Sequence, residues 1–150
     1  GFSGGTIKNP AYREVCTGRT GHAEVAHIEY DAEILSFEKI LEVFFFVHDP
    51  TQLNRQGNDI GTHYRSAIFY HSEEQRFLAN TAIKNLTELN LWENPIVTEV
   101  TKFSAFYPAD LGHQNYLANN PEQPYCQYIV RPKYEKFKLA FQTNLKKVKA

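Results

Sequence analysis

Two stretches of the chain contain most of the side chains that could do chemistry. The first, residues 9–24 (NPAYREVCTGRTGHAE), brings tyrosine, cysteine, glycine, histidine and glutamate together within sixteen positions. The second, residues 48–66 (HDPTQLNRQGNDIGTHYRS), is equally rich in histidine, carboxylates and tyrosine. We expect the two stretches to fold towards each other and to form one polar active site of a redox type.

Four residues in these stretches suit the binding and protonation of an oxygen atom. Tyr12 and Tyr64 could donate two phenol hydrogen bonds to one acceptor, such as a sulfoxide oxygen, although most loop tyrosines only pack on a core. Glu24 could act as a proton donor if apolar neighbours raise its pKa, whereas most glutamates are simply solvated. Asp59 is either a turn former or a carboxylate that positions a catalytic group.

The two cysteines allow different interpretations. Cys16 is either a buried, inert thiol, the commonest state of a free cysteine, or the nucleophile of a hydrolase formed with His22 and Glu24. Cys126 follows a proline-containing stretch, for which we expect a mobile loop. Mobility favours a thiol that travels to meet another thiol.

Composition excludes several classes of protein. A chain of 150 residues with 42% hydrophobic residues can form one domain with its own core. The net charge is −1, so the sequence shows no excess of basic residues that would indicate nucleic-acid binding. No apolar run approaches the ~20 residues of a membrane helix. Two cysteines favour a reducing, cytoplasmic setting. The six histidines lack the close spacing of metal ligands, so we expect no metal site. His48 and Asp49 are adjacent, and we expect them to cap a helix end and to form hydrogen bonds.

Local patterns predict a mixed α/β domain in which helices cover a small sheet. Ser36 is expected to cap the first helix, and Ser72 with Gln75 forms a capping-box pattern for the second. The expected elements are a loop at 1–21, a strand at 22–30, a helix at 37–47, a loop at 49–64, a strand at 66–71, a helix at 73–90, a strand at 96–103, a short helix at 110–119 and a C-terminal helix at 132–148 that packs on the domain.

Five sequence blocks together resemble one enzyme family, the A-type peptide methionine sulfoxide reductases. The similarity extends from the first residue to about Gln127, and its motifs are long and specific. The blocks are GFSGG at 1–5, NPAYREVCTGRTGHAE at 9–24, HDPTQLNRQGNDIGTHYRS at 48–66, FYPAD at 106–110 and HQNYLANNP at 113–121.

This resemblance implies a fold, a reaction and site residues. The fold would be a two-layer sandwich with a ferredoxin-like mixed sheet, formed by residues 1–150 as a single domain. The family's nucleophile is the cysteine of a Gly-Cys-Phe-Trp-Gly motif in a first strand, and we expect the printed chain to begin after it. Glu24 matches the acid that protonates the sulfoxide oxygen, and Tyr12 and Tyr64 match the phenols that bind it. Asp59 matches the carboxylate that helps to hold the substrate.

The resemblance also implies partners. The S-epimer of methionine sulfoxide, free or in proteins, would be reduced to methionine, with thioredoxin as reductant and no cofactor. Cys126 matches the recycling cysteine of many members, but the surrounding EQPYCQ replaces their Asn-Gly-Tyr-Cys and glycine-rich tail. We expect a cytoplasmic monomer that binds neither nucleic acid nor membranes. The alternative is a non-catalytic fragment that binds oxidised methionine without reducing it.

Overall fold

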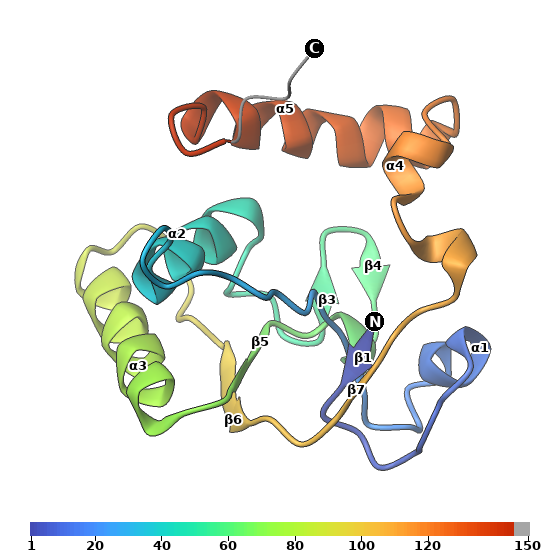
Figure 1. Cartoon of the computed structure of the whole chain (residues 1–150), viewed down its shortest axis with the longest axis horizontal. Helices are drawn as coiled ribbons and strands as arrows, with labels where there is room; N and C mark the ends of the chain where they lie inside the picture. Colours follow the sequence, from blue (N-terminus) through green and yellow to red (C-terminus); the bar gives the residue numbers. More distant parts are fainter. Residues whose placement is uncertain (146–150) are drawn as a thin grey trace. The chain divides into compact units, whose positions relative to one another are not determined.

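The chain forms two compact units in a computed structural model that describes residues 1–145 (Figure 1). The first unit is Gly1–Ala109 and the second is Asp110–Ala150. Helices and short strands are mixed, as the sequence predicts. The two-layer, ferredoxin-like arrangement, the single domain over residues 1–150 and the packing of a helix at 132–148 on that domain remain predictions. The last three positions of that helix lie outside the described residues.

A three-stranded antiparallel sheet brings the N-terminal segments together. Its strands are β1 (Phe2–Ser3), β2 (Ala23–Glu24) and β7 (Phe106–Tyr107), in the order β2-β1-β7. Phe2 lies opposite both Glu24 and Tyr107, and its side chain is buried. The central strand therefore fixes the position of the strand that carries Glu24.

Two expectations for this region are wrong. The loop expected at 1–21 contains β1 and a short helix, α1 (Tyr12–Cys16). The strand expected at 22–30 is limited to the two residues that pair with β1, and Val25 adds only a pair of backbone hydrogen bonds with Gly1. Local propensity alone therefore overestimates the length of this strand.

Apolar packing is concentrated in a layer formed by two helices and a two-stranded sheet, which we call the apolar layer. It consists of α2 (Phe37–Val47), α3 (Glu73–Glu88), β5 (Ala67–Tyr70) and β6 (Glu99–Lys102), and β5 and β6 are parallel. Leu41 and Phe45 of α2 are buried against Ala79 of α3. Figure 1 shows the two helices side by side. The four predicted elements are confirmed, although both strands are shorter than expected.

Helix caps in this layer agree with most of the sequence patterns. The Ser36 hydroxyl accepts a hydrogen bond from the Lys39 amide (3.2 Å), and the Ser72 hydroxyl accepts one from the Gln75 amide (3.2 Å). The predicted capping box also requires the Gln75 side chain to accept a hydrogen bond from the Ser72 amide. This part of the prediction is wrong, because the Gln75 side chain accepts from the preceding amide, that of His71 (2.8 Å). The helix ends at Glu88, two residues earlier than predicted.

The loop expected at 49–64 contains regular structure. It includes the hairpin β3 (Arg55–Gln56) and β4 (Asp59–Ile60), followed by the 3-10 helix η1 (Thr62–Tyr64). Gly57 has a φ of +58°, a conformation that glycine adopts without strain. A ladder of two residues carries no detectable alternation of apolar and polar side chains, so the sequence pattern does not reveal this hairpin.

The second unit is helical over its described part. It contains η2 (Leu111–His113), α4 (Tyr116–Asn119), the π-helix η3 (Cys126–Val130) and α5 (Arg131–Ala140). The mobile loop expected around Cys126 is wrong, because Cys126 begins a π-helix and is buried. The helix predicted at 132–148 is confirmed as far as Ala140 but is wrong for residues 141–145, which form turns after Phe141 leaves helical angles. The lysine-rich end and the apolar position Val148 lie outside the described residues.

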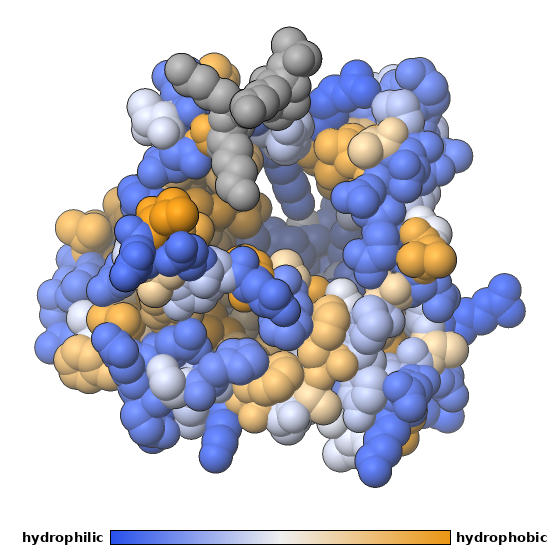
Figure 2. Space-filling view, viewed as in Figure 1, coloured by the Kyte–Doolittle hydropathy of each residue, from blue (hydrophilic) through white to orange (hydrophobic). Residues whose placement is uncertain are grey.

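Surface character varies over the molecule. Figure 2 shows hydrophilic residues over most of the face in view, interrupted by apolar residues over α2 and α3. In the range 1–145, no helix is long and apolar enough to cross a membrane.

Candidate active site

Three of the predicted site residues lie at the ends of short elements of the first unit. Tyr12 is the first residue of α1 and is half-buried. Tyr64 is the last residue of η1 and is also half-buried. Glu24 is the last residue of β2 and its side chain is exposed. Because β2 and η1 pack against each other, the acid and Tyr64 come from neighbouring segments.

Electrostatics show that these three side chains share one environment, which we call the phenol–acid cluster. The pKa of Tyr64 is raised by partial burial and by the negative charge of Glu24, while a hydrogen bond with Tyr12 acts in the opposite direction. The pKa of Tyr12 is raised by a hydrogen bond with Cys16, by partial burial and by the charges of its neighbours, Glu24 among them. A phenol is protonated at neutral pH even at its ordinary pKa of about 10, so both side chains can donate hydrogen bonds, and the upward shifts show that charge and burial act on both of them together.

Asp59 lies beside this cluster. It is half-buried in β4, opposite Gln56, and its charge contributes to the raised pKa of Tyr64. The structure therefore brings Asp59 together with the phenol–acid cluster.

His63 is a neutral neighbour of the cluster. Burial lowers the pKa of His63, which the charge of Asp59 opposes in part. Its ring lies 4.0 Å from the ring of Tyr64, measured between centroids, and its Nδ1 atom is buried without a hydrogen-bond partner among the described residues. The side chain therefore packs against Tyr64 and holds it from one side.

The hydrolase hypothesis for Cys16 is wrong. Cys16 is an exposed free thiol on α1, not the buried one that is commonest for cysteine. His22, its supposed base, is buried, and both ring nitrogens are occupied: the Gly5 amide donates to Nδ1 (3.0 Å) and Nε2 donates to the carbonyl of Ile7 (2.7 Å). An imidazole with both nitrogens engaged in backbone hydrogen bonds cannot accept a proton from a thiol.

His48 has the capping role that the sequence predicts. It follows α2, where its Nδ1 atom donates to the carbonyl of Phe44 (2.5 Å) and its Nε2 atom accepts from the hydroxyl of Ser66 (2.7 Å). The hydroxyl of Ser66 in turn pairs with that of Thr98 (2.8 Å). This chain of hydrogen bonds links the end of α2 to the start of β5.

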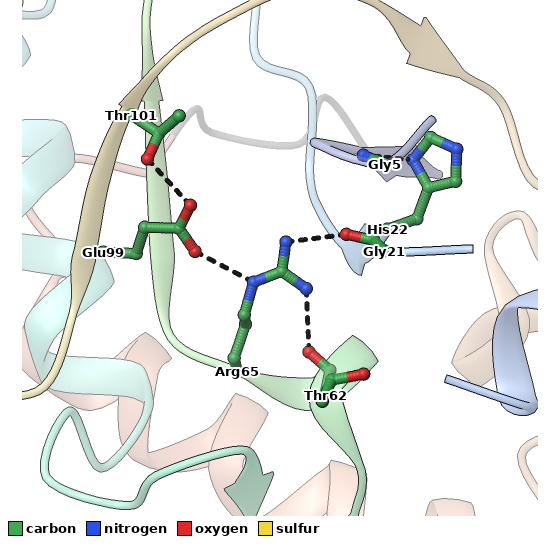
Figure 3. Close-up of polar contacts among 7 residues, drawn as sticks. All are labelled: Gly5, Gly21, His22, Thr62, Arg65, Glu99 and Thr101. Atoms are coloured by element: carbon green, nitrogen blue, oxygen red, sulfur yellow. Dashed lines mark hydrogen bonds and ion pairs between the residues drawn. The ribbon is translucent and has the colours of Figure 1, made fainter. Parts of the chain in front are cut away.

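Arg65 is a residue of this region that the sequence patterns do not single out. Its guanidinium donates to the carbonyls of Gly21 and Thr62, each at 2.9 Å (Figure 3). These carbonyls belong to the segments that lead to Glu24 and to Tyr64. The only signal in the sequence is the position of Arg65 directly after Tyr64 in the second chemistry-rich stretch.

Cys126 belongs to the other compact unit. Its side chain is buried and its thiol is free, as is that of Cys16. Within residues 1–145, no group of three or more histidine, cysteine or carboxylate side chains is arranged to hold a metal ion.

The arrangement suits chemistry at a polar oxygen atom. Two protonated phenols can donate hydrogen bonds to one oxygen, and a neighbouring carboxylic acid can supply a proton to it. Preorganised donors of this kind stabilise charge that develops on an oxygen during a reaction.

Comparison with known proteins identifies the family. Residues 1–145 match the family described as "Peptide methionine sulfoxide reductase". The chain is 54% identical to the peptide methionine sulfoxide reductase MsrA of Nautilia profundicola over 91% of this chain and 78% of that protein. It is 50% identical to the MsrA of Natronomonas pharaonis over 94% of this chain and 79% of that protein.

Solved structures agree with these relatives. Mxr1 from Saccharomyces cerevisiae in its reduced form superposes with a TM-score of 0.78 at 32% identity, over 85% of this chain and 72% of that chain. Methionine sulfoxide reductase A of Corynebacterium diphtheriae superposes with a TM-score of 0.71 at 37% identity, over 85% of this chain and 65% of that chain. Sequence and fold lead to the same conclusion: the chain belongs to the peptide methionine sulfoxide reductase family.

Proposed function

We propose that the phenol–acid cluster binds and protonates the oxygen of a methionine sulfoxide. Tyr12 and Tyr64 donate hydrogen bonds to that oxygen, and Glu24 delivers the proton. Asp59 helps to hold the substrate and the site. The observation that carries this proposal is the placement of the three side chains: β2, which ends at Glu24, packs against η1, which ends at Tyr64, and both phenols lie close enough to Glu24 to feel its carboxyl group.

The reaction is the thiol-dependent reduction of methionine sulfoxide in peptides and proteins, and the enzyme is a peptide-methionine (S)-S-oxide reductase. A cysteine thiolate attacks the sulfoxide sulfur, and the oxygen leaves that sulfur as it is protonated. The net products are methionine, reduced by two electrons, and a sulfenic acid on the cysteine, oxidised by two electrons. The family motif Gly-Cys-Phe-Trp-Gly, which carries this nucleophile, does not occur in the 150 residues.

Protonation is needed because an oxide is a poor leaving group. A hydroxyl leaves more readily, so a carboxylic acid placed next to the oxygen lowers the barrier, by roughly 10²- to 10⁴-fold in rate for a well-placed proton donor. The phenols act on the same atom, and a tyrosine hydroxyl, whose ordinary pKa is about 10, carries the proton it donates at neutral pH.

The proposal is tested with the Glu24→Gln variant of the full-length protein. The glutamine keeps the shape of the side chain but cannot donate a carboxylic proton. We expect the single-turnover rate of methionine formation from a peptide containing the S-sulfoxide to fall by roughly 10²-fold or more near neutral pH. Glu29→Gln, at an exposed position five residues further along the chain, is the matched control and should keep the wild-type rate.

Three outcomes, one with Glu24→Gln and two with the wild-type protein, would count against the proposal. An unchanged rate for Glu24→Gln would overturn the role of the acid. Binding of the sulfoxide peptide by the full-length wild-type protein without methionine formation would favour the alternative, a binding protein that does not reduce its ligand. Reduction of the R-sulfoxide at the same rate would contradict the expected selectivity for the S-epimer.

For the second half of the cycle, Cys126 is our candidate recycling thiol. It would condense with the sulfenic acid to form a disulfide and water, and a dithiol protein of the thioredoxin type would then reduce that disulfide by thiol exchange. Because the Cys126 side chain is buried at the first position of a π-helix, this step requires a local opening of the helix. Short π-helical segments are frequent at functional sites.

Cys126→Ser separates recycling from chemistry. We expect this variant to form about one equivalent of methionine in a single burst and then to lose sustained turnover with thioredoxin, because the disulfide cannot form. Cys16→Ser is the companion variant: serine keeps a hydroxyl beside Tyr12 while it removes the other free thiol, so sustained turnover should persist if Cys126 is the recycling thiol. Full thioredoxin-driven turnover in Cys126→Ser would show that another thiol recycles the enzyme.

The setting of the enzyme follows from the same chemistry. Two free thiols and a thioredoxin-type reductant favour a reducing compartment, which we propose to be the cytoplasm, with the enzyme acting as a monomer.

A further inference from the structure

Arg65 connects three separate parts of the first unit through one side chain. Its Nε atom donates to the carboxylate of Glu99 (2.9 Å), Nη1 to the carbonyl of Thr62 (2.9 Å) and Nη2 to the carbonyl of Gly21 (2.9 Å), as Figure 3 shows. The Arg65 side chain is only 17% exposed. A guanidinium is planar and holds its donors in a fixed geometry, so these three contacts also fix the positions of their acceptors relative to one another.

The two backbone acceptors belong to the segments that carry the chemistry. Gly21 precedes Glu24 by three residues, and the intervening His22 and Ala23 are buried. Thr62 begins the single turn of η1 that ends at Tyr64. One guanidinium therefore links the backbone that leads to the acid with the backbone that leads to one of the phenols.

The segment before Glu24 is held from another direction as well. His22 binds the backbone of Gly5 and Ile7 through its two ring nitrogens. Gly5 has no room for a side chain, because a Cβ atom there would lie 2.3 Å from the carbonyl oxygen of Thr20. The backbone around Gly21 is therefore held by His22 on one side and by Arg65 on the other.

Glu99 anchors the guanidinium to the apolar layer. Glu99 lies in β6, next to Ala67 of β5, and its second carboxylate oxygen accepts a hydrogen bond from the hydroxyl of Thr101 (2.7 Å). Partial burial acts to raise the pKa of Glu99, but the hydrogen bonds from Thr101 and Arg65 and the charge of Arg65 hold that pKa below its ordinary value. The carboxylate therefore remains charged at neutral pH and keeps Arg65 in place.

We propose that Arg65 is a positioning residue for sulfoxide reduction, which sets the distance between Glu24 and Tyr64 by holding the backbone of both segments against β6. This inference rests on the proposed function of the phenol–acid cluster. Arg65 touches neither the substrate nor the reacting atoms, and it acts through the two residues that do. A displacement of about 1 Å in such a cluster can reduce a rate by roughly 10²-fold.

Arg65→Lys in the full-length protein is the sharpest test. Lysine keeps the positive charge that faces Glu99, but its single ammonium cannot reproduce the fork that binds two carbonyls and a carboxylate. We expect kcat to fall on the order of tenfold to 10²-fold with little change in KM, because the loss concerns the transition state more than substrate binding. Arg76→Lys, in an exposed pair with Glu73 on α3, is the matched control and should change neither constant.

A combined variant distinguishes positioning from a merely structural role. If Arg65 acts by placing Glu24, then Arg65→Lys should reduce kcat much less in a Glu24→Gln background than in the wild type. An equal loss in both backgrounds, or a folded Arg65→Lys enzyme with unchanged kcat, would overturn the inference. If Arg65→Lys does not fold, Thr101→Val replaces it. This variant removes one hydrogen bond from Glu99, and it should lower kcat in the same direction by a smaller factor, whereas an unchanged kcat would overturn the inference.

Amide hydrogen exchange makes the test independent of the proposed reaction. In Arg65→Lys we expect faster exchange at the amides of residues 22–24 and 62–64 than in the wild type, since their common anchor is lost. Unchanged exchange at both segments would contradict the inference even if the wild type were inactive. A wild-type enzyme that fails to reduce the S-sulfoxide would count against the proposed function instead.

Discussion

The apolar layer and the phenol–acid cluster are held in place by different kinds of interaction. Leu41, Phe45 and Ala79 are buried among apolar neighbours, and nothing in this part of the described chain suggests chemistry. The cluster consists instead of half-buried or exposed polar side chains on elements of two to five residues. The comparison indicates that apolar packing is concentrated in the layer, whereas the cluster, to which we assign the chemistry in our proposal, is held by polar contacts.

Arg65 is in contact with both regions. It binds Glu99 in the sheet of the layer and the carbonyls of Gly21 and Thr62 next to the cluster. Short elements with few apolar contacts open easily on their own. An anchor to a well-packed sheet compensates for this weakness, which explains how residues on two-residue strands can hold a fixed geometry.

The largest effect on stability is expected from Phe45→Ala in the apolar layer. Removing a buried phenyl ring leaves a cavity and should lower the free energy of unfolding by about 3–5 kcal/mol. The single-turnover rate of methionine formation, counted per folded molecule, should not change. Denaturant unfolding together with single-turnover rates checks both statements. Phe46→Ala, at the neighbouring exposed position, is the matched control and should cost less than about 1 kcal/mol. A loss of rate per folded molecule in Phe45→Ala would break the separation of the two regions.

The reverse pattern is expected for the phenols. Tyr12→Phe and Tyr64→Phe each remove one donor to the sulfoxide oxygen, so the single-turnover rate should fall by roughly 10²-fold for each. The free energy of unfolding should change by no more than about 1.5 kcal/mol, the typical net contribution of one hydrogen bond. Tyr70→Phe in β5 is the matched control and should keep the wild-type rate. Rates unchanged in both phenol variants would show that the phenols bind no reacting oxygen.

A smaller effect, dependent on pH, is expected where the two regions meet. The folded-state pKa of Glu99 lies below its ordinary value of 4.5, so its ion pair stabilises the fold fully above that pH. This contribution is lost as the pH falls through the lower, folded-state pKa. The free energy of unfolding, measured as a function of pH, should be higher for the wild type than for Glu99→Gln by about 1 kcal/mol or less above pH 4.5. The difference should vanish in acid. A difference that persists in acid would show that the effect does not come from the charge of Glu99.

The apolar layer is the part of the fold that the sequence predicts well. Ser36 predicts the start of the helix Phe37–Val47, and Pro50 predicts its end to within about two residues, because caps and prolines are local signals. The strands β1 and β2 are different. They exist because Phe2 finds partners at Glu24 and Tyr107, which are distant in the sequence. No local pattern carries that information.

The site shows the same division. The resemblance to a known family singles out Tyr12, Glu24 and Tyr64, which the structure brings together. The resemblance does not single out Arg65. Its partners near the cluster are backbone carbonyls, which every residue type carries, so no sequence pattern marks these contacts. The prolines near Cys126 predict a mobile loop, but they precede a helix in which the Cys126 side chain is buried.

A double-mutant cycle on Glu24→Gln and Tyr64→Phe tests most directly whether the acid and the phenol act on the same oxygen. Each variant lowers the single-turnover rate by some factor, and independent effects would multiply in the double variant. If both side chains act on the same oxygen, the factor for the double variant should be at least about tenfold below that product, which is a coupling energy of at least about 1.4 kcal/mol. Losses that multiply to within about 0.5 kcal/mol would show that the two side chains act independently. That result would contradict a shared oxygen site.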